Sequence, residues 1–252
     1  NNHIKSAAPD EFSIDYFDQT HQNVQSNLVD NAAELFVLFT PNRNIFGYGV
    51  ERKPGTNLYP SFLLSYQKGL EIGAGTTTYS KLLFSYNQPL KLGKFGILNN
   101  TLETGKIFGD AQLSVLSPVP ANQTYSLVAN TFSLLNYYDF VVDQFLVGHF
   151  EHHFNGYILN KIPLIKKLKL RSLMTFRGVV GNISESNKNI NRSSIIYNAP
   201  KDLYYEYGFG IENIGFGNLR VFRVDCIWSS EFKNPNNSSP NFGVRLGMSP
   251  DF

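Results

Sequence analysis

The chain has 252 residues, and its 22 Lys and Arg nearly balance its 20 Asp and Glu, giving a formal net charge of +2. This balance argues against a protein that binds nucleic acid through a basic face. Charged residues make up 17% and aromatic residues 14% of the chain, a composition that excludes intrinsic disorder. The single cysteine, Cys226, excludes an intramolecular disulfide and a cysteine-built zinc site.

No stretch of the sequence predicts a membrane-spanning helix. The longest uninterrupted apolar run, Leu35–Phe39, falls far short of the roughly 20 residues that such a helix requires. The mean hydropathy of −0.20 alone would indicate a soluble protein. A transmembrane β-barrel hides its apolar face in alternate positions, however, so the average does not decide. The chain opens at Asn1 without a signal peptide, and we expect that one was removed or that the sequence is part of a longer protein.

Segments of about ten residues, separated by clusters of Gly, Asn, Pro and Ser, predict an all-β protein. Residues 1–32 are expected to be irregular with one short strand at 12–17, and residues 33–252 to form one β domain. Strands are predicted at 33–40, 59–68, 77–88, 96–108, 124–137, 141–154, 168–181, 203–214, 218–230 and 241–249. Long polar connections at 109–123, 183–199 and 231–240 alternate with tight ones at 92–95 and 215–218.

Apolar and polar residues alternate most clearly in the C-terminal third. Successive side chains of a strand point to opposite faces, so each strand there has one apolar and one polar face. In a membrane barrel the apolar face would meet lipid; it comprises Met174, Phe176, Tyr205, Tyr207, Phe209, Phe222, Val224, Trp228, Phe242, Val244 and Leu246. The polar face would line the lumen; it comprises Lys169, Arg171, Arg177, Glu206, Glu212, Arg223, Asp225 and Arg245.

Two structures satisfy this alternation. A soluble sandwich or barrel turns the apolar face into a core, whereas an outer-membrane barrel turns it toward lipid. Three features favour the membrane: both charge signs share the polar face with glycines, the chain ends on an alternating strand with Phe252, and aromatic residues recur at strand ends. Examples of these aromatic residues are Tyr137, Tyr138, Tyr204 and Tyr205. We predict an antiparallel transmembrane β-barrel of the bacterial outer-membrane type.

Several separated motifs carry a family resemblance. They are Tyr59–Phe62, Glu151–Gly156, Asn160–Lys169, Tyr204–Ile214 and Phe242–Gly247. In this order they resemble a Bacteroidota family whose members carry a carboxypeptidase-regulatory-like N-terminal domain followed by a region of unknown function similar to an outer-membrane barrel. The resemblance runs from about residue 36 to the C-terminus and implies no established reaction.

The chain departs from this family in two ways. The regulatory-like domain and the earlier strands are missing, so the chain is expected to be the C-terminal part of a larger barrel. Pro250 falls within the last strand, where it cannot donate a hydrogen bond to a neighbouring strand, so pairing should fray there.

His149, Glu151 and His153 share one face of a predicted strand. Two imidazoles and a carboxylate could hold a metal with one open position. Residues two apart lie roughly 7 Å apart along a strand, so a metal would need favourable rotamers. The alternative interpretation is that all three are polar residues bonded to their neighbours.

Four lysines accompany apolar residues around a proline in Lys161–Lys169. Such a segment is typical either of a membrane-surface patch that touches anionic headgroups, with the lysine stems lying along apolar surface, or of a solvated turn.

We therefore predict an integral outer-membrane β-barrel of a Gram-negative cell envelope, with a structural, transport or assembly-accessory role. It is expected to have no chemistry and no cofactor of its own, and to contact outer-membrane lipid and other outer-membrane proteins or lipoproteins. One alternative is a soluble secreted β-sandwich or lipocalin-like barrel that binds an apolar ligand. Another is a metal-dependent enzyme that uses His149, Glu151 and His153.

Overall fold

The computed structural model describes residues 2–6, 14–17, 24–25, 27–43, 45–46, 48, 53–54, 58–70, 78–193, 198–217, 219–230, 233–234, 237–238 and 241–248. Phe252 and Pro250 lie outside these residues. The regular structure of the described chain is antiparallel β-sheet with very little helix, which confirms the predicted all-β class. Within these ranges, the helices are too short and too polar to cross a membrane.

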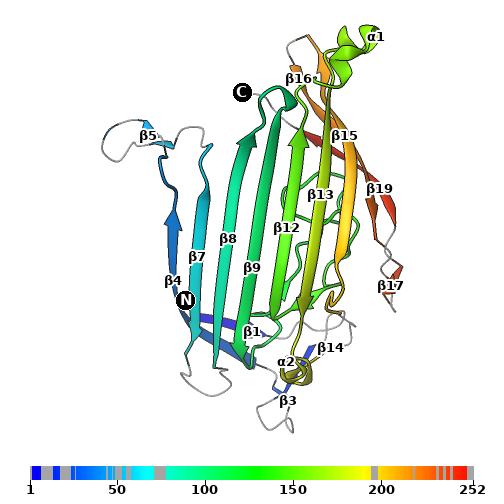
Figure 1. Ribbon diagram of the computed structural model, residues 1–252. Coiled ribbons are helices and arrows are strands. Elements are labelled where there is room, and N and C mark those ends of the chain that lie inside the picture. Colours follow the sequence, from blue (N-terminus) through cyan, green and yellow to red (C-terminus); the bar gives the residue numbers. More distant parts are fainter. Residues whose placement is uncertain are drawn as a thin grey trace.

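One large antiparallel sheet dominates the molecule (Figure 1). Its ten strands lie in the order β1-β4-β7-β8-β9-β12-β13-β15-β16-β19, so from β4 onward neighbours in the sheet follow one another along the chain. The bounds are β1 (Asn2–Ser6), β4 (Asn27–Phe39), β7 (Ser61–Gly69), β8 (Tyr79–Lys91), β9 (Ile97–Gly109), β12 (Gln144–His153), β13 (Arg171–Asn182), β15 (Tyr204–Phe216), β16 (Leu219–Ser229) and β19 (Phe242–Met248). Strand β4 crosses the expected boundary between residues 1–32 and 33–252.

The remaining elements are short. The small strands are β2 (Ile14–Phe17), β3 (Val24–Gln25), β5 (Ile45–Phe46), β6 (Lys53–Pro54), β10 (Ser117–Pro118), β11 (Val141–Val142), β14 (Asn191–Ser193), β17 (Lys233–Asn234) and β18 (Asn237–Ser238). The helices are η2 (Gly93–Phe95), η3 (Leu159–Lys161), α1 (Pro163–Lys166) and α2 (Glu185–Ile190). Strand β2 overlaps the short strand predicted at 12–17.

The two edges of the large sheet do not meet. Strand β1 pairs with the first residues of β4, 27–31, and β7 pairs with residues 32–39 on the other side. Strand β19 pairs with β16, and no pairing joins β19 to β1 or β4 among the described residues. Closure into a barrel is therefore not seen.

One predicted strand is wrong. Residues 124–137 lie in a long loop between β9 and β12, residues 110–143, which we call the inner loop. Its apolar residues Phe132, Leu134 and Leu135 are buried against the sheet. The peptide N–H groups of Ser133 and Leu134 bond to a side chain instead of a neighbouring strand. The apolar pattern here therefore reflects packing of an irregular segment.

The two tightest connections of the large sheet lie at one end, which also carries the longer β4–β7 connection, residues 40–60. The inner loop and the connections that follow β13 and β16 lie at the end that carries α2, which we call the long-loop end (Figure 1). The tight turns between β8 and β9 and between β15 and β16 lie at the opposite, tight-turn end. The connection between β12 and β13, residues 154–170, also lies at the tight-turn end and carries η3 and α1.

The inner loop packs on one face of the sheet, which we call the inner face. Figure 1 shows this loop behind β12, β13 and β15. Near the long-loop end, two apolar clusters join loop and sheet: Leu113 and Leu116 pack with Tyr79 and Ile107, and Phe132 packs in the cluster that holds Val179. The loop also covers part of the β19 edge, where the Leu127 N–H donates to the Leu246 carbonyl at 2.6 Å.

The outer face carries large apolar side chains that remain exposed. Along β15, the even-numbered positions 204–212 are buried, and the odd-numbered positions 205–211 between them are exposed. Alternate exposed apolar residues continue on β7, β8, β13, β16 and β19. From β12 to β16 the inner face is thus mainly polar and buried beneath the inner loop, whereas the outer face is apolar and exposed.

Candidate functional site

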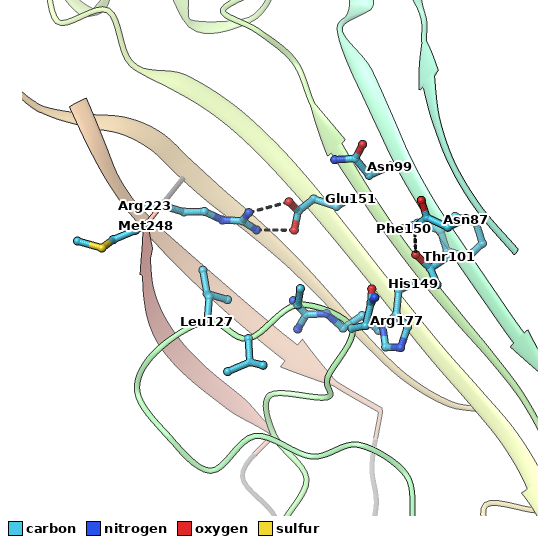
Figure 2. Close-up of a pocket in the computed structure, with 13 residues that line it drawn as sticks. Asn87, Asn99, Thr101, Leu127, His149, Phe150, Glu151, Arg177, Arg223 and Met248 are labelled. Carbon is cyan, nitrogen blue, oxygen red and sulfur yellow. Dashed lines mark hydrogen bonds and ion pairs between the residues drawn. The ribbon is translucent and has the colours of Figure 1, made fainter. Parts of the chain in front are cut away.

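The inner face encloses a polar cavity of about 490 Å³ between the sheet and the inner loop. Figure 2 shows the Arg223 guanidinium directed at the Glu151 carboxylate in the lining of this cavity, with Asn87 and Thr101 on strands β8 and β9. The sheet residues that line the cavity are Asn87, Asn99, Thr101, His149, Phe150, Glu151, Arg177, Arg223 and Met248, and the loop contributes residues 127–130. Strands far apart in sequence therefore supply one polar wall.

Five charged side chains in and beside this wall form a continuous, largely buried network. The guanidinium of Arg223 grips the Glu151 carboxylate with two bonds of 2.7 and 2.8 Å. The same guanidinium grips Asp225 with bonds of 2.8 and 2.6 Å. On the other side of Glu151, His153 bonds to it through Nε2 at 2.8 Å and to Glu212 through Nδ1 at 2.9 Å. The order is Glu212–His153–Glu151–Arg223–Asp225.

The register of the sheet places these residues together. Glu151 and His153 lie on β12, Glu212 on β15, and Arg223 and Asp225 on β16. Both nitrogens of His153 meet carboxylate oxygens, which only accept hydrogen bonds when ionised, so the ring donates from both and is positively charged. Three carboxylates thus face two cations within the network. Buried charges are tolerated when they are paired in this way.

A second buried cluster fastens the inner loop to the sheet. The carboxylate of Glu206, which is 1% exposed, accepts the peptide N–H groups of Ser133 and Leu134 at 2.7 and 2.8 Å and the Tyr204 hydroxyl at 3.0 Å. Arg177 donates to the Ser133 hydroxyl at 2.8 Å, and Arg245 donates to the Ser133 carbonyl. The same short stretch of loop is therefore held from three strands.

The three residues considered as metal ligands are divided between different environments. Glu151 and His153 belong to the network, whereas the His149 ring packs against Phe132 with centroids 5.4 Å apart. The Nδ1 atom of His149 is buried without a hydrogen-bond partner among the described residues. Within the same ranges, no three His, Cys, Asp or Glu side chains are grouped to hold a metal ion. The geometry favours the interpretation that these are polar residues of the inner wall.

The charged residues expected on the polar face lie on the inner face, with one exception. Buried there are Arg177, Glu206, Glu212, Arg223 and Asp225, and Arg171 and Arg245 are partly buried. Lys169 differs, because β13 begins at Arg171 and Lys169 stands in the exposed turn before it, with a φ of 53°. The strand was predicted to begin at residue 168, so Lys169 was assigned to a face of the sheet although it lies in the preceding turn.

The residues expected on the apolar face lie on the outer face. Exposed there are Met174, Phe176, Tyr205, Tyr207, Phe209, Phe222, Phe242, Val244 and Leu246, and Val224 and Trp228 are partly exposed. Five of their rings form an unbroken aromatic chain across four strands, in the order Phe176–Tyr205–Tyr207–Trp228–Phe242, with centroid distances of 6.0, 6.5, 5.9 and 5.1 Å. Three of the rings, Tyr205, Trp228 and Phe242, lie toward the long-loop end of their strands.

Other aromatic residues at predicted strand ends lie elsewhere. Tyr204 is buried on the inner face beside Phe132 and Phe140, and Tyr137 and Tyr138 belong to the inner loop. A second outer cluster, which the sequence did not single out, joins Phe62 to Phe39 at 6.4 Å and to Tyr86 at 5.4 Å. This cluster lies toward the tight-turn end of β4 and β7.

Sequence reasoning also missed the neutral half of the cavity wall. Asn87 donates to Thr101 at 2.7 Å across β8 and β9, and Thr175 is buried on β13. On β8, Asn87 shares a face with Ser85 and Lys81, and this alternation could have identified it. The face has no repeated charge, so it did not stand out in the sequence. Asn187 and Asn191, which bond to the inner-loop backbone at Ala111 and Leu113, gave no signal at all.

A comparison with known protein families gives a match over most of the chain. Residues 5–186 match the C-terminal domain of a family of unknown function, DUF5686. No curated protein matches the chain.

Proposed function

The chain belongs to the DUF5686 family of unknown function, and we propose that it forms the C-terminal part of an integral outer-membrane β-barrel. The observation that carries this proposal is the distribution of the two faces. Large apolar side chains stay exposed on the outer face, while Glu206, Arg223 and Asp225 are buried on the inner face. A soluble protein gains stability by burying its apolar side chains in a core. An outer-membrane barrel instead removes them from water by turning them toward lipid.

Aromatic residues on the outer face support this interpretation. Membrane barrels carry aromatic girdles at both interfaces, with an apolar band between them. Here one chain of rings includes Tyr205 and Trp228 near the long-loop end, and another cluster around Phe62 lies near the tight-turn end. The placement of these rings fits two interfaces at opposite ends of the strands.

The position of the two tightest turns, β8–β9 and β15–β16, supports an orientation. Bacterial barrels have short periplasmic turns and longer external loops. We assign the tight-turn end to the periplasm and the long-loop end, with α2, to the outside. Strand β19 runs from the long-loop end to the tight-turn end, so the C-terminal side of the chain points to the periplasm in this arrangement.

The open edge at β4 supports a larger barrel. Among the described residues, positions 33–39 of β4 pair with β7 and with no other strand. Phe36 and Leu38 on the inner face and Leu35 and Val37 on the outer face are all more than half exposed. Unpaired strand edges are normally covered or closed. We propose that the strands that close the barrel belong to an earlier part of the full protein. In this proposal they follow a regulatory-like N-terminal domain, and the whole is an envelope protein of Bacteroidota.

The role that fits this inner face is structural, transport-related or accessory to assembly, with no chemistry of its own. The inner loop fills much of the space against the sheet, and the inner charges compensate one another. The partners of such a protein are outer-membrane lipid and other outer-membrane proteins or lipoproteins.

Trp228, the one tryptophan of this sequence, offers a direct test. The full-length protein is reconstituted into vesicles whose acyl chains are brominated either near the headgroup or near the chain end, and tryptophan emission is compared with that of Trp228→Phe. The difference signal should be quenched by bromine, more strongly by the shallow label because Trp228 lies near the end of β16.

The alternative, a soluble β-sandwich or lipocalin-like barrel, predicts a different result. The protein would then be monodisperse without detergent, and the Trp228 signal would be insensitive to brominated lipid. Either observation would overturn the proposal.

A further inference from the structure

We propose that the tight-turn end carries a binding site for an anionic phospholipid, formed by the segment Tyr157–Leu170 and the β15–β16 turn. This inference rests on the proposed membrane location and adds a ligand class to it. The two segments meet at an apolar groove of about 510 Å³. Figure 1 shows α1 at this end of the sheet, beside the ends of β15 and β16.

The groove has the shape and chemistry of an acyl-chain site. Leu168 and Leu170 line it from one side, and Ile214, Phe216, Leu219 and Phe222 line it from the other. Phe222 belongs to the outer face, where it opposes Met248 on β19. The groove is therefore continuous with the surface that we assign to lipid. Phe216 at its mouth is 94% exposed and Leu219 is 64% exposed.

Arg220 lines this groove, and the segment that supplies Leu168 and Leu170 carries four lysines. Lys161, Lys166, Lys167 and Lys169 are exposed, and none of them forms an ion pair within the described residues. Residues 154–171 and 213–222 contain no Asp or Glu. An uncompensated basic cluster at a membrane surface attracts anionic headgroups.

Arg220 stands between the groove and the lysines. Its side chain donates to the backbone carbonyls of Leu168, Asn213 and Gly217, which orient the guanidinium but leave its charge uncompensated. These contacts use its Nε and Nη1 groups, so its Nη2 group remains to donate a charge-assisted hydrogen bond to a phosphate oxygen. We assign the lipid phosphate to Arg220 and the neighbouring lysines.

The apolar residues of the same segment point to the membrane as the source of this ligand. Leu164, at the centre of α1, is 81% exposed, and Ile158 and Ile162 are both more than 40% exposed. A free phosphate would gain nothing from these side chains. A membrane-embedded lipid supplies both the headgroup for the lysines and the hydrocarbon for the leucines and isoleucines.

The experiment measures lipid binding to the full-length protein in a neutral detergent, by native mass spectrometry. Phosphatidylglycerol and phosphatidylcholine with the same acyl chains are titrated against the wild type. The test variant is Lys166→Gln/Lys167→Gln/Arg220→Gln. The charge-matched control is Lys106→Gln/Lys188→Gln/Lys201→Gln, which alters three cations near the long-loop end.

The wild type should prefer phosphatidylglycerol by a factor on the order of tenfold or more. The test variant should lose this preference and the control should keep it. Equal binding of the two lipids, a preference that survives in the test variant, or an equal loss in both variants would each overturn the site.

A second variant, Phe216→Ser, probes the groove separately. Because this side chain is almost fully exposed, the change leaves the fold intact. It should weaken binding of both lipids while keeping the preference for phosphatidylglycerol, and unchanged affinity would overturn the acyl-chain assignment. The two experiments fail separately. If brominated lipid quenches Trp228 but the protein shows no preference for anionic lipid, only the lipid site is wrong. If brominated lipid does not quench Trp228, the proposed membrane location is wrong.

Discussion

Arg223→Leu tests whether the buried network holds the inner face together. Arg223 makes two hydrogen bonds to Asp225, which is 0% exposed, and two to Glu151. Leucine removes the cation, so the buried carboxylate of Asp225 loses both hydrogen bonds from Arg223. Glu151 keeps its bond to His153 and retains some contact with solvent, so most of the cost falls on Asp225. Breaking a buried ion pair by removing one partner costs about 3–5 kcal/mol, and we expect a loss of this size.

A double variant separates charge from packing. Arg223→Leu/Asp225→Leu removes the stranded carboxylate together with its partner, and well-packed apolar replacements of a buried pair are often nearly neutral. We expect the double variant to be more stable than Arg223→Leu by about 2 kcal/mol. The control is Lys188→Leu, which breaks an exposed pair with Glu185 and should cost less than about 1 kcal/mol.

The assay is equilibrium unfolding by urea in lipid vesicles, followed by tryptophan emission, with the free energy of unfolding obtained by linear extrapolation. The reasoning is refuted if Arg223→Leu lies within about 1 kcal/mol of the wild type. It is also refuted if the double variant is less stable than the single one, because the stranded charge would then not be the source of the loss.

Two further predictions concern the inner face. Glu206→Gln should weaken the attachment of the inner loop, because the amide keeps only one oxygen acceptor and turns N–H groups toward a peptide N–H. Hydrogen bonds to charged groups contribute about 1.5–3 kcal/mol each, so we expect a loss of about 3 kcal/mol in the free energy of unfolding. Gly210→Ala should lower the free energy of unfolding by about 2 kcal/mol, because the added methyl group would meet the Asp225 carboxylate. The control Gly178→Ala should have almost no effect in the same assay, because the nearest atom to its methyl group would be 3.4 Å away.

The alternation of residue types predicted most of the sheet because it is a local property. Side chains on a strand change face at every residue whatever the strand pairs with. The assignment of Glu206 and Tyr207 to opposite faces therefore needed no knowledge of the fold. The same local rule failed at residues 124–137, where Phe132 is buried by a loop, and at Lys169, where the strand had not yet begun.

The contacts of the site could not be predicted in the same way. His153 and Glu212 are 59 positions apart, and Glu151 and Arg223 are 72 apart. Which of them meet depends on the register between strands, and on the bulges in the β15–β16 pairing near Ile214. The sequence placed His149, Glu151 and His153 on one face, but it held no information on which one would join the charged network and which would lie against Phe132.

The pairing of the inner charges bears on which role the proposed barrel can have. An ion pathway is selective when charges of one sign face the passing ion, whereas here Arg223 is engaged by two carboxylates and Glu206 is engaged by the inner loop. A transport role through this part of the wall therefore requires the loop to leave Glu206, because only then does this carboxylate face open water. A structural or assembly role needs no such movement and is strengthened by a fixed loop. Conductance of Glu206→Gln distinguishes the two: a large increase favours transport through a gated lumen, and a destabilised protein with unchanged conductance favours a barrel whose interior is permanently filled.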